Sequence, residues 1–129
     1  MKILAAYLGV AIAVFAQTPT PAESIEESIY VYSEYRMVKI DLADIEYIES
    51  MEDYIKIHIE NQKTVLTLIP MKKILEKLPA EKFQRIHRSY IVPVNKIKAI
   101  HNRKVQLANA ELPISDSYTE FARRWMKFR

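Results

Sequence analysis

The stretch FQRIHRSYIV, residues 83–92, decides the fold. It places three side chains that are cationic or can become so, Arg85, His87 and Arg88, directly before an apolar run at 90–92. Such a run is typical of a buried strand, whereas a guanidinium or an imidazole needs water or a polar partner for its donors. The stretch therefore predicts a buried strand with hydrogen-bond donors just before its first residue.

Charged residues are segregated along the chain, whose formal net charge is +3. Positions 82–110 contain no Asp or Glu, whereas the charged residues of 41–60 are acidic apart from Lys56. A clustered basic segment is the usual signature of a polyanion partner, although a merely solvated basic face gives the same pattern. The basic residues of the segment are Lys82, Arg85, Arg88, Lys96, Lys98, Arg103 and Lys104.

The composition excludes several kinds of site. The 129 residues include no Cys, which excludes disulfides, thiolate catalysis and Cys-type zinc sites, and a single glycine, Gly9, which excludes a Gly-rich phosphate loop. His58, His87 and His101 share no metal-ligand spacing, and nothing marks a nucleophile elbow. We therefore expect no metal, no cofactor and no enzymatic activity.

The first 28 residues differ from the rest. Residues 1–16 form a hydrophobic segment that starts with Lys2 and then stays apolar, and residues 17–28 form a polar linker. The layout is that of a secretory signal, and the apolar run is shorter than the roughly 20 residues that span a bilayer. A signal peptide, a membrane anchor and the remnant of a junction with a lost domain all remain open for residues 1–16.

Residues 29–129 are expected to form one mainly β domain. Residues 54–60, YIKIHIE, alternate Ile with Lys, His and Glu, which is typical of a half-buried strand. The apolar spacing in 71–78 predicts a short amphipathic helix, and a capping box at 117–120 predicts a C-terminal helix. Further strands are expected at 29–33, 36–40, 45–50, 63–69, 89–92, 97–101, 103–107 and 111–114.

Three blocks of this domain resemble one family. FQRIHRSYIVPVNKIKAI (83–100), preceded by IEYIESMEDYIKIHI (45–59) and followed by ELPISDSYTEF (111–121), is similar in order and spacing to the LytTR-type DNA-binding domain. That domain is the output module of many bacterial response regulators of the LytR/AlgR type. The resemblance implies an elongated arrangement of small β-sheets with a short internal helix and a C-terminal helix. It also implies binding of double-stranded DNA through loops that enter successive major grooves.

The resemblance maps the base contacts to three loops, at 51–54, 87–89 and 115–117. The chain departs from the family in the first loop, where Glu52 and Asp53 stand at positions that often hold Gly and Asn or a basic residue. It departs again at Asp116 and Ser117, where Arg is common. Carboxylates can only accept from a base such as cytosine, so the loop at 87–89 is expected to be the main reader.

The sequence thus predicts a sequence-specific transcriptional regulator in the cytoplasm, with no receiver domain in the same chain. Arg88 is the best candidate to contact a guanine, because the N–H groups of its planar guanidinium can donate to O6 and N7 of that base together. A homodimer on paired sites and membrane contact through 3–16 stay open. The alternative is an exported or membrane-tethered β-domain that binds other proteins. The candidate DNA-binding residues are Arg85, His87, Arg88, Ser89, Tyr54, Lys96, Lys98, Arg103, Lys104, Ser115 and Ser117.

Overall fold

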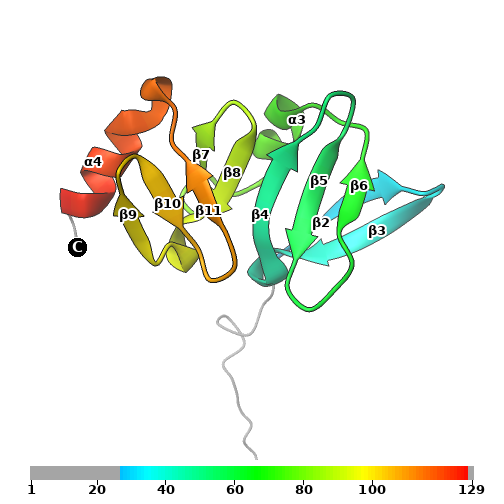
Figure 1. Ribbon diagram of the computed structural model, residues 1–129. Coiled ribbons are helices and arrows are strands. Elements are labelled where there is room, and N and C mark those ends of the chain that lie inside the picture. The colour runs from blue at the N-terminus through cyan, green and yellow to red at the C-terminus, as the bar shows by residue number, and fades with distance from the viewer. Residues whose placement is uncertain (1–26, 128–129) are drawn as a thin grey trace, which may run out of the picture.

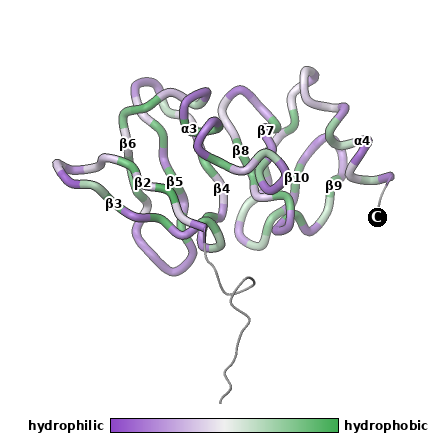
Figure 2. Tube along the Cα trace, turned by 180° about the vertical axis from the view of Figure 1, so that it is seen from behind, coloured by the Kyte–Doolittle hydropathy of each residue, from purple (hydrophilic) through white to green (hydrophobic). Residues whose placement is uncertain are grey.

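The computed structural model describes residues 27–127, so the expectations for residues 1–26 lie outside the described part. This part is mainly β, with three antiparallel sheets side by side and two α-helices (Figure 1). The mainly β fold with an internal and a C-terminal helix is therefore confirmed. Figure 2 shows hydrophobic residues along the strands of the central sheet and hydrophilic residues at the turns that join them.

The central sheet has five strands in the order β6-β5-β4-β8-β7. The alternating segment forms β5, where the three isoleucines are buried and the residues between them are half-buried. Period-two burial follows because successive side chains of a strand point to opposite faces. The bounds are β4 (Ile45–Ser50), β5 (Ile55–Ile59), β6 (Val65–Thr67), β7 (Phe83–His87) and β8 (Tyr90–Pro93).

One face of the central sheet packs on a hairpin and a helix. The hairpin consists of β2 (Ser28–Ser33) and β3 (Arg36–Asp41), and the helix is α3 (Met71–Lys77). Ile74 of α3 is fully buried, as the amphipathic spacing predicts. This first core contains Ile29, Val31, Ile40, Leu42, Ile45, Ile48, Ile55, Ile57, Ile59, Met71, Ile74, Leu78, Phe83 and Ile91.

The C-terminal part of the chain builds a second core. Its sheet has the order β11-β10-β9, with β9 (Ala99–His101), β10 (Lys104–Gln106) and β11 (Glu111–Pro113), and α4 (Thr119–Lys127) packs beside it. The strands of this sheet are shorter than the apolar spacing predicts. The second core contains Ile86, Val92, Ile97, Val105, Leu107, Leu112, Ile114, Phe121 and Ala122.

Strand β8 belongs to both cores. Ile91 lies in the first core and Val92 in the second, and neither is exposed to solvent. A strand covered on both faces needs apolar residues at consecutive positions rather than at alternate ones. This explains the unbroken apolar run at 90–92 from which the fold is inferred.

Three short 3-10 helices complete the described part, and one of them shifts a predicted boundary. They are η1 (Leu42–Asp44), η2 (Val94–Lys96) and η3 (Asp116–Tyr118). The C-terminal helix begins at Thr119, inside the predicted capping box rather than directly after its first residue, because η3 includes Ser117 and Tyr118. The strand predicted at 63–69 is shortened to β6, whose pairing with β5 extends only from Val65 to Thr67.

Candidate nucleic-acid interface

The turn between β7 and β8 carries the donors of the opening stretch. Arg85 lies opposite Ile91 and His87 lies opposite Tyr90, so Ile86 is an extra residue in β7. Such a β-bulge changes the face to which the following residue belongs. His87 consequently joins the face of Tyr90, and the ring centroids of the two side chains lie 5.4 Å apart.

The backbone of the turn fixes the tautomer of His87. The backbone N–H of Ser89 donates to Nδ1 of His87 over 3.1 Å. Nδ1 is therefore the acceptor nitrogen, and in the neutral ring the proton lies on Nε2. His87 is half-buried and can present one N–H donor outward from the turn.

Arg85 and Arg88 have different surroundings. Nε of Arg85 donates to the carbonyl of His87 over 3.3 Å, and Nη2 of Arg85 donates to the carbonyl of Arg88 over 2.7 Å. The side chain of Arg85 thus stabilises the backbone of the turn by hydrogen bonds, while Arg88 is exposed at the tip of the turn. Of the two guanidinium groups, that of Arg88 is the more exposed.

Backbone hydrogen bonds bring the other two predicted loops to this turn. The N–H of Ser50, just before the loop at 51–54, donates to the carbonyl of Ser89 over 2.8 Å. The N–H of Ser115 donates to the carbonyl of Ile86 at the bulge over 3.0 Å. The three loops therefore lie along one edge of the molecule, the upper edge in Figure 1. We call this edge the three-loop edge.

A groove of about 530 Å³ at the three-loop edge mixes both signs of charge. Glu52 and Asp53 from the first loop line it together with Arg85 and Arg88. Lys72, at the start of α3, lines it too and is exposed. Lys72 is not among the residues predicted from the sequence, because only the packing of α3 on the sheet brings this side chain to the loops.

Tyr54 also lines this groove and is half-buried. The backbone N–H of Met51 donates to the carbonyl of Tyr54 over 2.8 Å, which closes the first loop. The position of Tyr54 beside Arg88 is compatible with the predicted DNA contact and with packing alike.

In the third loop Ser115 is half-buried and Ser117 is exposed. Arg103, in the turn after β9, forms an ion pair with Asp116. Both partners are largely exposed, so the pair adds little to stability. Lys104 follows Arg103 and is exposed. Arg103 and the two serines therefore belong to the three-loop edge, and Lys104 adjoins it.

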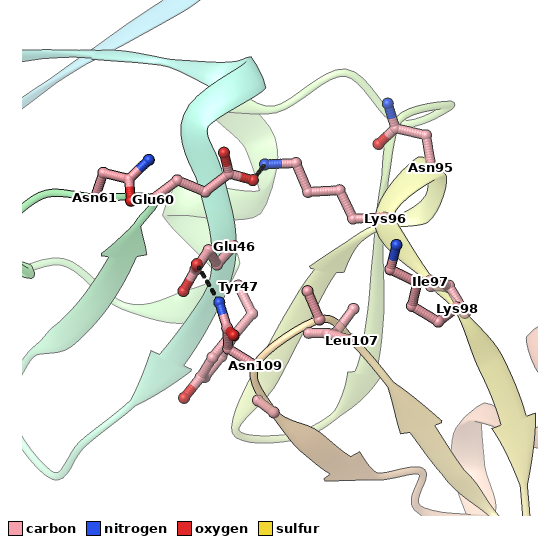
Figure 3. Close-up of a pocket in the computed structure, with 12 residues that line it drawn as sticks. Glu46, Tyr47, Glu60, Asn61, Asn95, Lys96, Ile97, Lys98, Leu107 and Asn109 are labelled. Carbon is pink, nitrogen blue, oxygen red and sulfur yellow. Dashed lines mark hydrogen bonds and ion pairs between the residues drawn. The ribbon is translucent and has the colours of Figure 1, made fainter.

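Lys96 and Lys98 lie elsewhere, at the opposite end of the sheets. Nζ of Lys96 donates to the carbonyls of Ala43 and Ile45 over 2.6 and 3.0 Å, and to Oε2 of Glu60 over 2.7 Å (Figure 3). An ammonium has three donors, so these acceptors use all of them. The predicted DNA contact of Lys96 remains a prediction that this geometry does not favour.

Lys98 lines a groove of about 460 Å³ at this opposite end. In Figure 3, Asn109 closes one side of this groove, where its amide donates to Oε2 of Glu46 over 3.1 Å. Tyr47 lines the same groove, and burial, with a smaller effect of Glu49, raises the pKa of its phenol. The basic segment of the sequence is thus divided between two ends of the fold.

Other kinds of site find no support in the described part. Residues 27–127 contain no group of three or more His, Asp or Glu side chains that could hold a metal ion. Over the same range, no helix combines the length and the apolar character needed to cross a bilayer.

Comparison with known proteins supplies the family. The family model of the LytTr DNA-binding domain matches residues 35–127. The fold is similar to the LytTr DNA-binding domain of a Bacillus cereus protein described as a methyl-accepting/DNA response regulator. That likeness has a TM-score of 0.64 at 24% identity and covers 77% of this chain and 95% of the other. No curated protein matches the chain. The match over residues 35–127 establishes that the chain belongs to the LytTr DNA-binding domain family.

Proposed function

We propose that the protein is a sequence-specific transcriptional regulator that reads the major groove of double-stranded DNA through the three-loop edge. The observation that carries this proposal is the hydrogen bonding that joins three loops, distant in sequence, into one edge with Arg88 exposed at its centre. The proposed role is recognition without catalysis, in keeping with the family.

Arg88 is the proposed base reader. Its neighbour His87 offers one N–H donor, which suits an acceptor such as guanine N7 or thymine O4. Arg85 is assigned to holding the turn, since two of its N–H groups donate to backbone carbonyls. Contacts from Tyr54, Ser89, Ser115 and Ser117 to bases or phosphates are part of the proposal.

Phosphate contacts supply the remaining affinity. Arg103, Lys104 and Lys72 are exposed and lie at or beside the three-loop edge. Each phosphate that a protein neutralises contributes about −0.9 to the slope of log K against log salt on duplex DNA. Binding should therefore weaken steeply as salt is raised.

The test is selection of bound sequences from a random DNA pool, followed by titration of the selected and a scrambled duplex at several salt concentrations. The proposal expects a selected motif, tighter binding to it than to the scrambled duplex, and a steep salt slope. Failure to enrich any sequence would contradict specific recognition, and binding that is insensitive to salt would contradict the phosphate contacts.

Two finer points belong to this proposal. The protein would act in the cytoplasm, where its DNA target lies, and two copies would occupy paired sites. Contact of residues 3–16 with a membrane also stays a prediction, because those residues lie outside the described part. The comparisons give no support to the alternative of an exported interaction module.

A further inference from the structure

The β2–β3 hairpin has an apolar surface that the DNA-binding role leaves unused. Its inner face is buried in the first core, but Tyr30, Tyr32 and Met37 on the outer face are 53%, 58% and 63% exposed. Tyr35 at the tip is 94% exposed. The solvated face of an antiparallel sheet is normally polar, and an exposed apolar patch marks an interaction surface. All of β2 also precedes the residues that match the family.

The turn of the hairpin fixes which backbone groups point outward. Glu34 and Tyr35 have φ values of 53° and 68°, as a two-residue type I′ turn requires, and Ser33 pairs with Arg36. In such a hairpin the flanking pair exchanges hydrogen bonds, and every second pair along the ladder does the same. The backbone groups of the remaining residues, including Met37 and Lys39 of β3, therefore point away from the partner strand.

The outward backbone groups of β2 and β3 differ in their hydrogen bonding. On β2, the outward carbonyl of Tyr32 accepts a hydrogen bond from Oγ1 of Thr67 over 2.7 Å. On β3, the outward N–H and carbonyl groups of Met37 and Lys39 have no hydrogen-bond partner within residues 27–127. Figure 1 shows the hairpin behind β5 and β6, with its tip projecting beyond the five-stranded sheet. An open edge of this kind is a template for another strand.

We propose that β3 pairs with β3 of a second copy of this chain, antiparallel and about a two-fold axis beside Val38. Met37 of each copy then lies opposite Lys39 of the other, and all four outward N–H groups and carbonyls of the two residues in each copy find partners. The two hairpins become one four-stranded sheet. A two-stranded sheet is only marginally stable by itself, so this extension also stabilises the hairpin.

A second copy fits this edge better than an unrelated strand, because a two-fold axis makes the edge complementary to itself. The axis beside Val38 sets no like charges directly opposite one another, whereas an axis beside Lys39 would set two ammonium groups face to face. In the first register Arg36 lies opposite Ile40 of the other hairpin, and Tyr35 lies opposite Asp41. The absence of facing like charges therefore favours the first register.

Pairing through β3 would leave the three-loop edge accessible, since the hairpin and the loops occupy different sides of the sheets (Figure 1). Two copies joined at β3 could therefore bind DNA together. Binding of two DNA sites by such a dimer rests on the proposed function. The pairing of the two β3 strands does not.

The test is sedimentation of the full chain over a range of concentrations. Wild type should form a concentration-dependent dimer, and Met37→Lys should weaken it about tenfold or more, because each introduced ammonium would face Lys39 of the other copy. Met37→Glu should retain the dimer, since a carboxylate would then face Lys39. The double variant Met37→Lys with Lys39→Glu should restore it. Leu68→Lys is the matched control, because Leu68 is 76% exposed but lies outside the hairpin.

Several outcomes would overturn the pairing. They are a wild type that stays monomeric at every concentration, and equal effects of Met37→Lys and Leu68→Lys. A monomer whose hairpin tyrosines resist nitration would assign the patch to another segment of the chain and would likewise overturn it. Circular dichroism of each variant excludes unfolding as the cause. A dimer that does not bind DNA would contradict the proposed function and leave the β3 pairing intact. A protein that binds DNA but stays monomeric would contradict the pairing and leave the proposed function intact.

Discussion

The side chain of Arg85 is hydrogen-bonded to the backbone of Arg88, its Nη2 lying 2.7 Å from the Arg88 carbonyl oxygen. Two arginines three residues apart therefore have separate tasks. One uses its donors inside the protein, and the other keeps its guanidinium in solvent. This division suggests how the two should differ when each is replaced.

Arg88→Ala should remove the main base contact. We expect a loss of about 1–3 kcal/mol in binding to the selected site and a relaxed preference at one base pair, with random DNA bound almost as before. Competitive titration against single-base variants of the site measures both effects. Unchanged discrimination at every position would remove Arg88 from the reading role.

Arg85→Ala should also impair specific binding, by about tenfold, but through the loosened turn that carries Arg88. Because Arg85 is not assigned a phosphate, the salt slope should stay as in wild type. Arg85→Lys should rescue only in part, since an ammonium lacks the planar fork that spans two carbonyls. A slope that falls by about 0.9 with unchanged sequence preference would instead place Arg85 on a phosphate.

Lys72 and Lys98 form a matched pair for the location of the DNA. Lys72→Gln should reduce the steepness of the salt slope by about 0.9, because Lys72 lines the groove at the three-loop edge. Lys98→Gln should leave the slope unchanged, because Lys98 lies at the opposite end. Equal effects of the two substitutions would mean that the DNA follows a different path across the fold.

The acidic first loop should suppress non-specific binding. Glu52 and Asp53 are exposed beside Arg88 and should repel phosphates. We expect the double variant Glu52→Gln with Asp53→Asn to bind random DNA on the order of tenfold more tightly at low salt, with a smaller ratio of specific to random affinity. Glu111→Gln is the control, since this exposed carboxylate lies on β11, away from the three loops. An unchanged ratio would show that the first loop does not approach DNA.

Ile86→Ala should destabilise the fold by about 2–5 kcal/mol, because Ile86 is fully buried at the bulge and its truncation leaves a cavity in the second core. Leu66→Ala, at a residue that is 42% exposed, should cost much less. Denaturant unfolding compares the free energies. Similar costs for the two variants would contradict the packing described for the bulge.

The sequence predicts those parts of the fold that depend on local periodicity. The alternating isoleucines identify β5, and the spacing of Met71 and Ile74 identifies α3. The extra residue at Ile86 could not be predicted, because a bulge leaves the apolar pattern almost unchanged. The resemblance to a family, rather than periodicity, pointed to the three loops.

The basic segment shows where linear reasoning fails for the site. Lys96 stands among basic residues in the sequence, yet its charge is balanced by Glu60, 36 positions away. Lys72 stands outside the segment, yet it lines the groove with Arg88. Both facts depend on pairing and packing between distant elements, which composition does not encode.

The two consecutive residues of β8 that face different cores also bear on how the molecule unfolds. Loss of this one strand would open both cores at once, since Ile91 would leave the first and Val92 the second. The two halves of the domain should therefore unfold in a single cooperative step. By the same linkage, DNA bound at the turn beside β8 should slow hydrogen exchange in β2 and in β10 alike. The strand that follows the turn at 87–89 is thus also the thermodynamic link between the two cores of the molecule.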